Sequence, residues 1–225
     1  MNVIVTGGTG ALGGAVVKAF LDAGHRVLSV GGHHESDSVQ NDRLLHARYD
    51  LTLADSAAQL VDEAIAKLGS FEVVVHTMGA FAGGEPVQKT SNDIWNTMLS
   101  VNLNAAFFLM RAVIPHLLEQ KRGRVLAVGS RSAIQPAGGL SAYVVSKAGL
   151  QALIATLALE LTGSGVTANT VLPSVIDSPA NRKAMPRADF SRWVKPEAIA
   201  NLLLWLASDD TAAVNGAAIP VYGNA

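Results

Sequence analysis

A glycine-rich turn near the start of the chain restricts the possible folds more than any other feature. Residues 2–6 form a short β-branched run, the letters TGGTGALGG follow (residues 6–14), and residues 15–23 have the composition of a helix that ends before Gly24. A second strand is expected over residues 26–30. This order predicts a βαβ unit whose turn lets a dinucleotide pyrophosphate approach the start of the helix.

Strands and helices alternate over the rest of the chain. Strands are predicted at residues 44–49, 71–76, 124–129, 166–172 and 217–221, and helices at residues 53–68, 91–119, 143–161 and 196–207. No change of composition marks a linker, and only residues 174–194 look irregular. Residues 1–225 should therefore form one α/β domain, a doubly wound parallel sheet of about seven strands with helices on both faces.

Polar positions follow the ends of several predicted strands. Asp50 follows the third strand, a glycine-rich loop follows His76 at the end of the fourth, Ser130 follows the fifth, and Pro173 ends the sixth. In a doubly wound sheet, ligands bind outside the carboxyl ends of the strands, where the strand order changes direction. These positions and the glycine turn should therefore meet at one crevice.

Tyr143 and Lys147 lie four residues apart in a segment that favours a buried helix. At this spacing the two side chains share one helix face. A phenol and an ammonium on a buried face need partners or a chemical role. The cation should lower the pKa of the phenol, which would make Tyr143 a usable acid or base near neutral pH. Taken alone, the spacing is more typical of a surface pair.

The composition excludes several classes of function. The net charge is −1 without a long basic block, which gives no support for binding nucleic acid or an anionic membrane. The chain has no cysteine, so disulfides, thiolate metal sites and cysteine nucleophiles are excluded. His33 and His34 have no third ligand in view, and no metal site is expected. No secretory signal is visible and the apolar stretch 150–161 is short and interrupted, so we expect a soluble cytoplasmic protein.

Taken together, the motifs resemble the short-chain dehydrogenase/reductase family over essentially the whole chain. They are Thr6-Gly7-x-x-Gly10-x-x-Gly13, Asp50-Leu51, Asn102, Ser130, Tyr143-x-x-x-Lys147 and Pro173-x-x-Ile176-x-Ser178. The resemblance implies a Rossmann fold and an oxidoreductase that transfers a hydride between NAD(P) and a small carbonyl or alcohol. It also implies a homo-oligomer, a dimer or tetramer, and a substrate-covering segment at residues 174–194.

The resemblance implies a role for each member of a catalytic group. Tyr143 would be the proton donor or acceptor, Lys147 would lower its pKa and hold the nicotinamide ribose, Ser130 would polarise the substrate oxygen, and Asn102 would hold a water linking Lys147 to solvent. The implied cofactor contacts are Gly7, Thr9, Gly10, Leu12, Gly13, Asp50, Leu51, Gly79, Tyr143, Lys147, Ile176 and Ser178. Asp50 has a second reading, a cap for the following helix, but the resemblance favours contact with adenine.

The choice between NAD and NADP depends on the end of the second strand. NAD-dependent enzymes place an acidic residue there to bind the ribose 2′-hydroxyl. This chain has Gly31, followed by Gly32, His33 and His34. The lack of a carboxylate removes the repulsion of a 2′-phosphate, and a histidine could donate to it, so the sequence favours NADP(H) over NAD(H).

Two alternatives to a general carbonyl reductase stay open. Residues 172–193 and 78–84 are similar to dihydropteridine reductases, which favours a quinonoid dihydropterin as substrate, but Ser130 replaces an alanine of the animal enzymes. The other alternative is a non-catalytic dinucleotide-binding sensor. A sensor would not need the complete set of Asn102, Ser130, Tyr143 and Lys147. The family pattern is also broken at Ala11, at His76-Thr77-Met78 and at Ser174.

Overall fold

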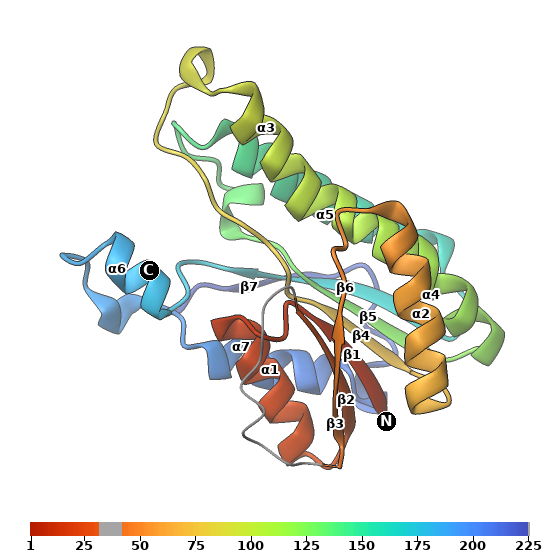
Figure 1. Ribbon diagram of the computed structural model, residues 1–225. Coiled ribbons are helices and arrows are strands. Elements are labelled where there is room, and N and C mark those ends of the chain that lie inside the picture. The colour runs from red at the N-terminus through yellow and green to blue at the C-terminus, as the bar shows by residue number, and fades with distance from the viewer. Residues whose placement is uncertain (32–41, 225) are drawn as a thin grey trace.

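The computed structural model describes residues 1–31 and 42–224, in which the strands form one parallel sheet. Seven strands lie in the order β3-β2-β1-β4-β5-β6-β7 (Figure 1). Their bounds are Asn2–Thr6 (β1), Arg26–Gly31 (β2), Leu44–Arg48 (β3), Val73–His76 (β4), Gly123–Val128 (β5), Val166–Pro173 (β6) and Ala218–Val221 (β7). The order changes direction between β1 and β4, where Thr6 lies opposite His76. The predicted doubly wound α/β fold is confirmed.

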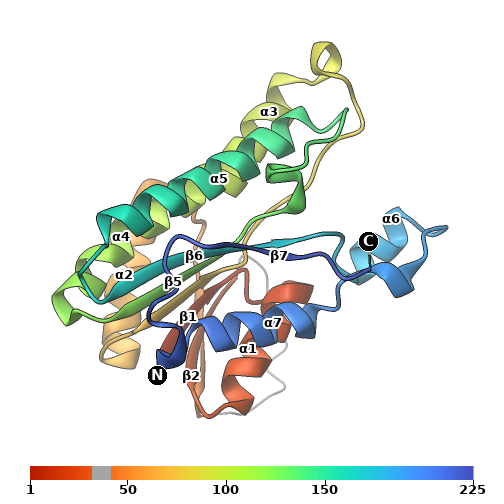
Figure 2. The ribbon, with the colours of Figure 1, turned by 180° about the vertical axis from the view of Figure 1, so that it is seen from behind.

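Helices cover both faces of the sheet. α2, α4 and α5 lie on one face, and α1 and α7 lie on the other (Figures 1 and 2). The bounds are Ala11–Asp22 (α1), Ala54–Leu68 (α2), Asn92–Leu99 (α3), Ala105–Gln120 (α4), Ser141–Glu160 (α5), Pro179–Ala184 (α6) and Pro196–Leu206 (α7). Each face has its own apolar cluster, one containing Leu60 and Leu109 and the other containing Phe20 and Leu203.

The central strands are buried between these two layers. Val3 and Val5 of β1 belong to the cluster beneath α1 and α7, whereas Ile4 belongs to the cluster beneath α2, α4 and α5. β4, β5 and β6 are buried along their whole length, as expected for parallel strands with helices on both faces. The carboxyl ends of these strands are therefore held in place from both sides.

α1 begins four residues earlier than the sequence predicts. It starts at Ala11, directly after the N-cap residue Gly10, and so includes two glycines of the turn. One of them, Gly13, packs directly on the turn, since a Cβ there would lie 2.0 Å from the Gly7 carbonyl oxygen. The helix therefore begins inside the glycine motif because the absence of side chains allows this close packing.

The helix predicted at residues 91–119 is divided into two. Ser91 is the N-cap of α3 and its Oγ accepts a hydrogen bond from the Ile94 amide at 3.2 Å. A π-helical turn at Ser100–Asn104 then separates α3 from α4, which continues through Pro115. π-turns inside longer helices are frequent at functional sites. The prediction of one continuous helix was wrong at this turn, which carries Asn102.

The segment 174–194 is more ordered than its sequence predicts. It contains the short helix α6 and a 3₁₀ turn at Phe190–Arg192. Ile176 forms a parallel bridge with Val194, which closes the segment at its base. In Figure 1, α6 lies at one side of the molecule, beyond the ends of β6 and β7.

Two stretches are long and apolar enough to cross a membrane by length and composition alone, namely residues 92–120 and Ser141–Glu160. The second contradicts the expectation of a short, interrupted stretch, because α5 begins at Ser141. Helices in the core of a globular protein meet the same criteria. Leu109 and Leu117 of α4 and Leu150 of α5 are fully buried against the sheet, which accounts for the apolar composition of both stretches.

Candidate active site

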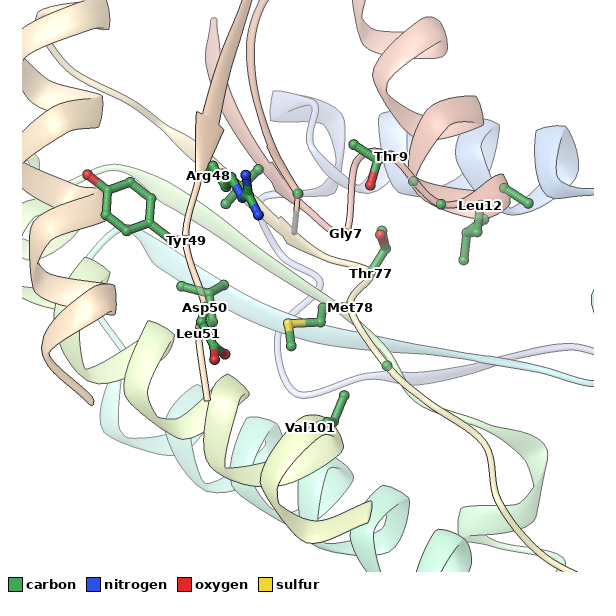
Figure 3. A pocket seen from close by; sticks show the side chains of 16 residues that line it. Gly7, Thr9, Leu12, Arg48, Tyr49, Asp50, Leu51, Thr77, Met78 and Val101 are labelled. Atoms are coloured by element: carbon green, nitrogen blue, oxygen red, sulfur yellow. The ribbon is translucent and has the colours of Figure 1, made fainter. Parts of the chain in front are cut away.

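A cavity of about 720 Å³ lies at the carboxyl ends of β1 to β4, where the strand order changes direction (Figure 3). Eight of the predicted cofactor contacts line it: Gly7, Thr9, Gly10, Leu12, Gly13, Asp50, Leu51 and Gly79. The other described lining residues are Ala11, Val30, Gly31, Arg48, Tyr49, Thr77, Met78 and Val101. The glycine turn, Asp50 and the loop after His76 therefore meet as predicted, whereas Ser130 and Pro173, predicted at the same crevice, do not line this cavity.

The glycine turn presents backbone to this cavity. Gly7 has a φ of 73°, a conformation that favours glycine, and its carbonyl accepts a hydrogen bond from the Gly10 amide at 3.0 Å. The following helix, α1, has no side-chain cap and no acidic residue in its first turn. Its first amides and the positive end of its dipole therefore face the cavity with no acidic side chain in the first turn, an arrangement suited to a phosphate group.

Asp50 makes a local turn and also lines the cavity. Its Oδ1 accepts hydrogen bonds from the amide of Thr52 at 3.0 Å and from the Thr52 hydroxyl at 2.6 Å. α2 begins two residues further on, and its N-cap residue Leu53 makes no side-chain cap. Asp50 therefore shapes the chain before α2 without capping that helix, and the predicted contact with adenine stays a prediction.

Ser130 and Tyr143 meet at the carboxyl end of β5. Ser130 is buried, and its Oγ accepts a hydrogen bond from the Ser132 amide at 3.1 Å. Tyr143 is half-buried in the first turn of α5 and also hydrogen-bonds to the Ser130 side chain. Burial raises the pKa of the Tyr143 phenol, and the hydrogen bond from Ser130 opposes that rise. The Phe81 ring packs edge-on against Tyr143, with centroids 5.0 Å apart.

Lys147 lies deeper in the same site. Its Nζ donates a hydrogen bond to the Val128 carbonyl at 2.9 Å, and burial lowers the pKa of the ammonium to about 8. The expected effect of Lys147 on Tyr143 is not found, because burial dominates the pKa of the phenol and raises it. Lys147 instead acts on buried His76, whose pKa is lowered to about 3 by burial and by this cation. His76 Nδ1 hydrogen-bonds to the Thr6 hydroxyl at 2.8 Å.

The π-turn directs the Asn102 side chain inward. Its Oδ1 accepts from the Ala80 amide at 2.8 Å, and its Nδ2 donates to the Ala80 carbonyl at 3.0 Å and to Ser146 Oγ at 3.0 Å. A Cβ on Gly79 would lie 3.0 Å from Asn102 Oδ1 and 3.1 Å from Lys147 Nζ. Asn102 therefore fastens the loop after β4 beside Lys147, and its role as a water holder stays a prediction.

Four predicted cofactor contacts do not line this cavity, namely Tyr143 and Lys147, described above, and Ile176 and Ser178. Ile176 is paired with Val194 at the base of the substrate-covering segment. Ser178 is the N-cap of α6, where its Oγ accepts from the Asn181 amide at 3.2 Å. The structure therefore gives both residues local roles, and their contact with a cofactor stays a prediction. His33 and His34 lie outside the described residues, and within the described ones no group of three His, Asp or Glu side chains could hold a metal.

Arg48 was not predicted from the sequence as a site residue. Among the described residues that line the cavity, it is the one with a positively charged side chain. Arg48 is the last residue of β3 and is aligned with Gly31 of β2. The signal was the alternation of side chains along this strand, since Leu45, Ala47 and Tyr49 pack on one core cluster whereas Leu44 packs on the other. That alternation places Arg48 on the face opposite Tyr49, as Figure 3 shows.

Comparisons with known proteins give a consistent result. The family model described as short chain dehydrogenase matches residues 1–189. The 4-formylbenzenesulfonate dehydrogenase TsaC1/TsaC2 of Comamonas testosteroni is 30% identical, covering 98% of this chain and 95% of that protein. The NADP-dependent 3-hydroxy acid dehydrogenase YdfG of Salmonella typhimurium is 26% identical, covering 92% and 89%. The solved structure of a short-chain type dehydrogenase/reductase from Mycobacterium ulcerans has a TM-score of 0.92 at 24% identity, covering 99% and 88%.

Proposed function

The chain belongs to the short-chain dehydrogenase family and is an NAD(P)-dependent oxidoreductase of small alcohols and carbonyl compounds, and from this premise we propose that Tyr143 transfers the proton. The observation that carries the proposal is the contact between Tyr143 and Ser130 after the carboxyl end of β5, where the buried Lys147 donates to the Val128 carbonyl. A substrate oxygen placed between the two hydroxyls could be held by Ser130 and protonated by Tyr143.

The titration of the two groups supports a reduction that begins with a protonated tyrosine. Burial raises the pKa of Tyr143, so its phenol carries a proton at neutral pH before the cofactor binds. Lys147, with a pKa of about 8, can return a proton to the site after the phenol has given one up. When bound, the nicotinamide supplies or accepts the hydride, and the protein supplies position and electrostatics.

For the cofactor, we propose NADP(H) in the cavity beside the glycine turn. Gly31 offers no carboxylate to a ribose 2′-hydroxyl, and one relative, at 26% identity, is named an NADP-dependent dehydrogenase. The free amides at the start of α1 would hold the pyrophosphate. Leu51 and Val101 would give the adenine an apolar environment.

We also propose that the protein is a cytoplasmic homo-oligomer. α4 and α5 together expose Phe107, Leu118, Val145 and Leu159, large apolar side chains that pairing between subunits would cover. The substrate is a small molecule, enclosed by the segment 174–194. A dihydropterin is a second substrate candidate on sequence similarity alone.

The experiment is a panel of carbonyl compounds that includes a quinonoid dihydropterin, assayed with NADPH and NADH by nicotinamide absorbance. Tyr143→Phe should lower kcat by about 10²- to 10⁴-fold and leave cofactor binding in place. Tyr222→Phe is the matched control, since it removes a buried hydroxyl without a hydrogen-bond partner among the described residues. Unchanged turnover in Tyr143→Phe would contradict the proposed role. Reduction of the dihydropterin alone would replace the general assignment with the pterin one.

A further inference from the structure

The carboxyl ends of β2 and β3 form an unusual pair at the edge of the cofactor cavity. Gly31 of β2 and Arg48 of β3 are aligned partners in the parallel ladder, and both line the cavity. In a parallel pair, aligned residues direct their side chains to the same face of the sheet. The face of Arg48 is therefore the one toward which a side chain at Gly31 would point.

The position of Gly31 cannot hold an acidic side chain unless the Thr9 side chain moves. A Cβ added to Gly31 would lie 2.5 Å from Thr9 Cγ2 and 2.8 Å from Thr9 Oγ1. The Thr9 side chain thus occupies the place where a carboxylate would stand. Gly31 at the end of β2 therefore offers no charge to this corner, where the glycine turn places the Thr9 hydroxyl, and the neighbouring strand β3 ends in a cation, Arg48.

Arg48 is placed to supply that charge. Its side chain is exposed, and no hydrogen bond or ion pair engages it within residues 1–31 and 42–224. Figure 3 shows it directed from β3 toward Gly7 and Thr9, away from the Tyr49 ring. The acidic residue that also lines the cavity, Asp50, has one oxygen occupied by Thr52.

We propose that Arg48 recognises the 2′-phosphate of NADP(H), with the Thr9 hydroxyl as a second donor. A guanidinium can hold a phosphate through two parallel N–H donors, and such bonds between charged groups are stronger than neutral ones. The phosphate would lie at the carboxyl ends of β2 and β3, beside the Thr9 side chain that fills the place of a Gly31 side chain. This assignment rests on the proposed binding of a dinucleotide in this cavity.

The test compares two nucleotides that differ mainly by the 2′-phosphate, adenosine 2′,5′-bisphosphate and adenosine 5′-monophosphate. Binding of each is measured by calorimetry to the wild-type protein, to Arg48→Gln and to Arg26→Gln. The last is a matched control, because Arg26 begins β2 at the opposite end of the sheet and donates to the Lys67 carbonyl. The same three proteins are then assayed for kcat/KM with NADPH and with NADH.

The wild-type protein should bind the bisphosphate more tightly, and Arg48→Gln should reduce that advantage by roughly ten- to a hundredfold. Binding of the monophosphate should change by less than about threefold, and Arg26→Gln should match the wild type. Equal binding of the two nucleotides by the wild type, or an advantage that survives in Arg48→Gln, would overturn the assignment. If neither nucleotide nor either dinucleotide binds, the proposed cofactor site itself is wrong, and this inference falls with it.

Discussion

Replacing Lys147 with methionine should make the protein more stable at neutral pH while it abolishes turnover. The Lys147 side chain is buried and donates to the Val128 carbonyl, and within the described chain no carboxylate pairs with it. Burial lowers the pKa of the ammonium from 10.5 to about 8. Methionine has a similar length and no charge, so it fills the same space without the cost of desolvation.

The size of the effect follows from the pKa. A fall from 10.5 to about 8 means that the charged lysine destabilises the folded state by about 3 kcal/mol below pH 8. Loss of the hydrogen bond to Val128 destabilises the variant by about 1 kcal/mol. The free energy of unfolding of Lys147→Met should therefore exceed that of the wild type by about 2 kcal/mol near pH 7.

The sign of the pH dependence is also determined. Between about pH 8 and 10.5, the unfolded chain keeps the Lys147 proton that the folded chain has lost, so wild-type stability rises with pH. Above this window the desolvation cost is gone, and Lys147→Met should be the less stable protein by about 1 kcal/mol. Neighbouring His76 does not titrate in the window, since its pKa is about 3.

The assay is urea unfolding of both proteins without cofactor, at about pH 7 and above about pH 10.5. Lys18→Met is the control, because Lys18 is exposed and makes only an ion pair with Asp22 one turn along α1. Its stability relative to the wild type should show no comparable change of sign with pH. A Lys147→Met protein that is less stable near pH 7, or that differs from the wild type by the same amount at both pH values, would refute the reasoning.

Two pairs of glycine substitutions should distinguish close packing from open space. Gly13→Ala places a Cβ 2.0 Å from a backbone oxygen of the turn. It should lower the free energy of unfolding, measured in urea, by about 2 kcal/mol and abolish nucleotide binding. The control Gly14→Ala, whose Cβ would have its nearest neighbour at 3.7 Å, should leave stability unchanged or raise it. Gly79→Ala places a Cβ 3.0 Å from Asn102 Oδ1 and should lower kcat/KM by about tenfold, whereas Gly138→Ala, with no neighbour within 4 Å, should not. Full binding by Gly13→Ala, or full activity of Gly79→Ala, would contradict these accounts.

The sheet could be predicted from the sequence because its signals are local. Apolar runs such as residues 73–76 and 125–128 suit strands buried on both faces, and within the turn after β1 Gly13 packs directly on Gly7. The position of Ser130 at the carboxyl edge of the sheet followed from its place directly after a predicted strand, whereas the resemblance to the family was needed to place Tyr143 beside it. These features depend on neighbours in the chain, so a single sequence contains them.

Two features could not be predicted in the same way. The sequence of Ser100–Asn104 contains no proline or glycine, and nothing in it marks a π-turn. The pKa of Tyr143 depends on how deeply the phenol is packed, which the Tyr143–Lys147 spacing does not report. Arg48 is an intermediate case, because the alternation along β3 was readable but its partner Gly31 is on another strand.

The π-turn lets one stretch of helix both pack on the core and direct Asn102 toward the loop after β4. Each extra residue rotates the following helix by about 100°, so one wide turn resets which side chains face the sheet. Met98 before the turn and Leu109 after it are both buried, which keeps the apolar face of the helix pair on the core. Within the turn, Asn102 is freed from that pattern and reaches the Ala80 backbone. A continuous α-helix could not both pack its apolar face on the core and fasten the loop beside Lys147, whereas the π-turn allows both.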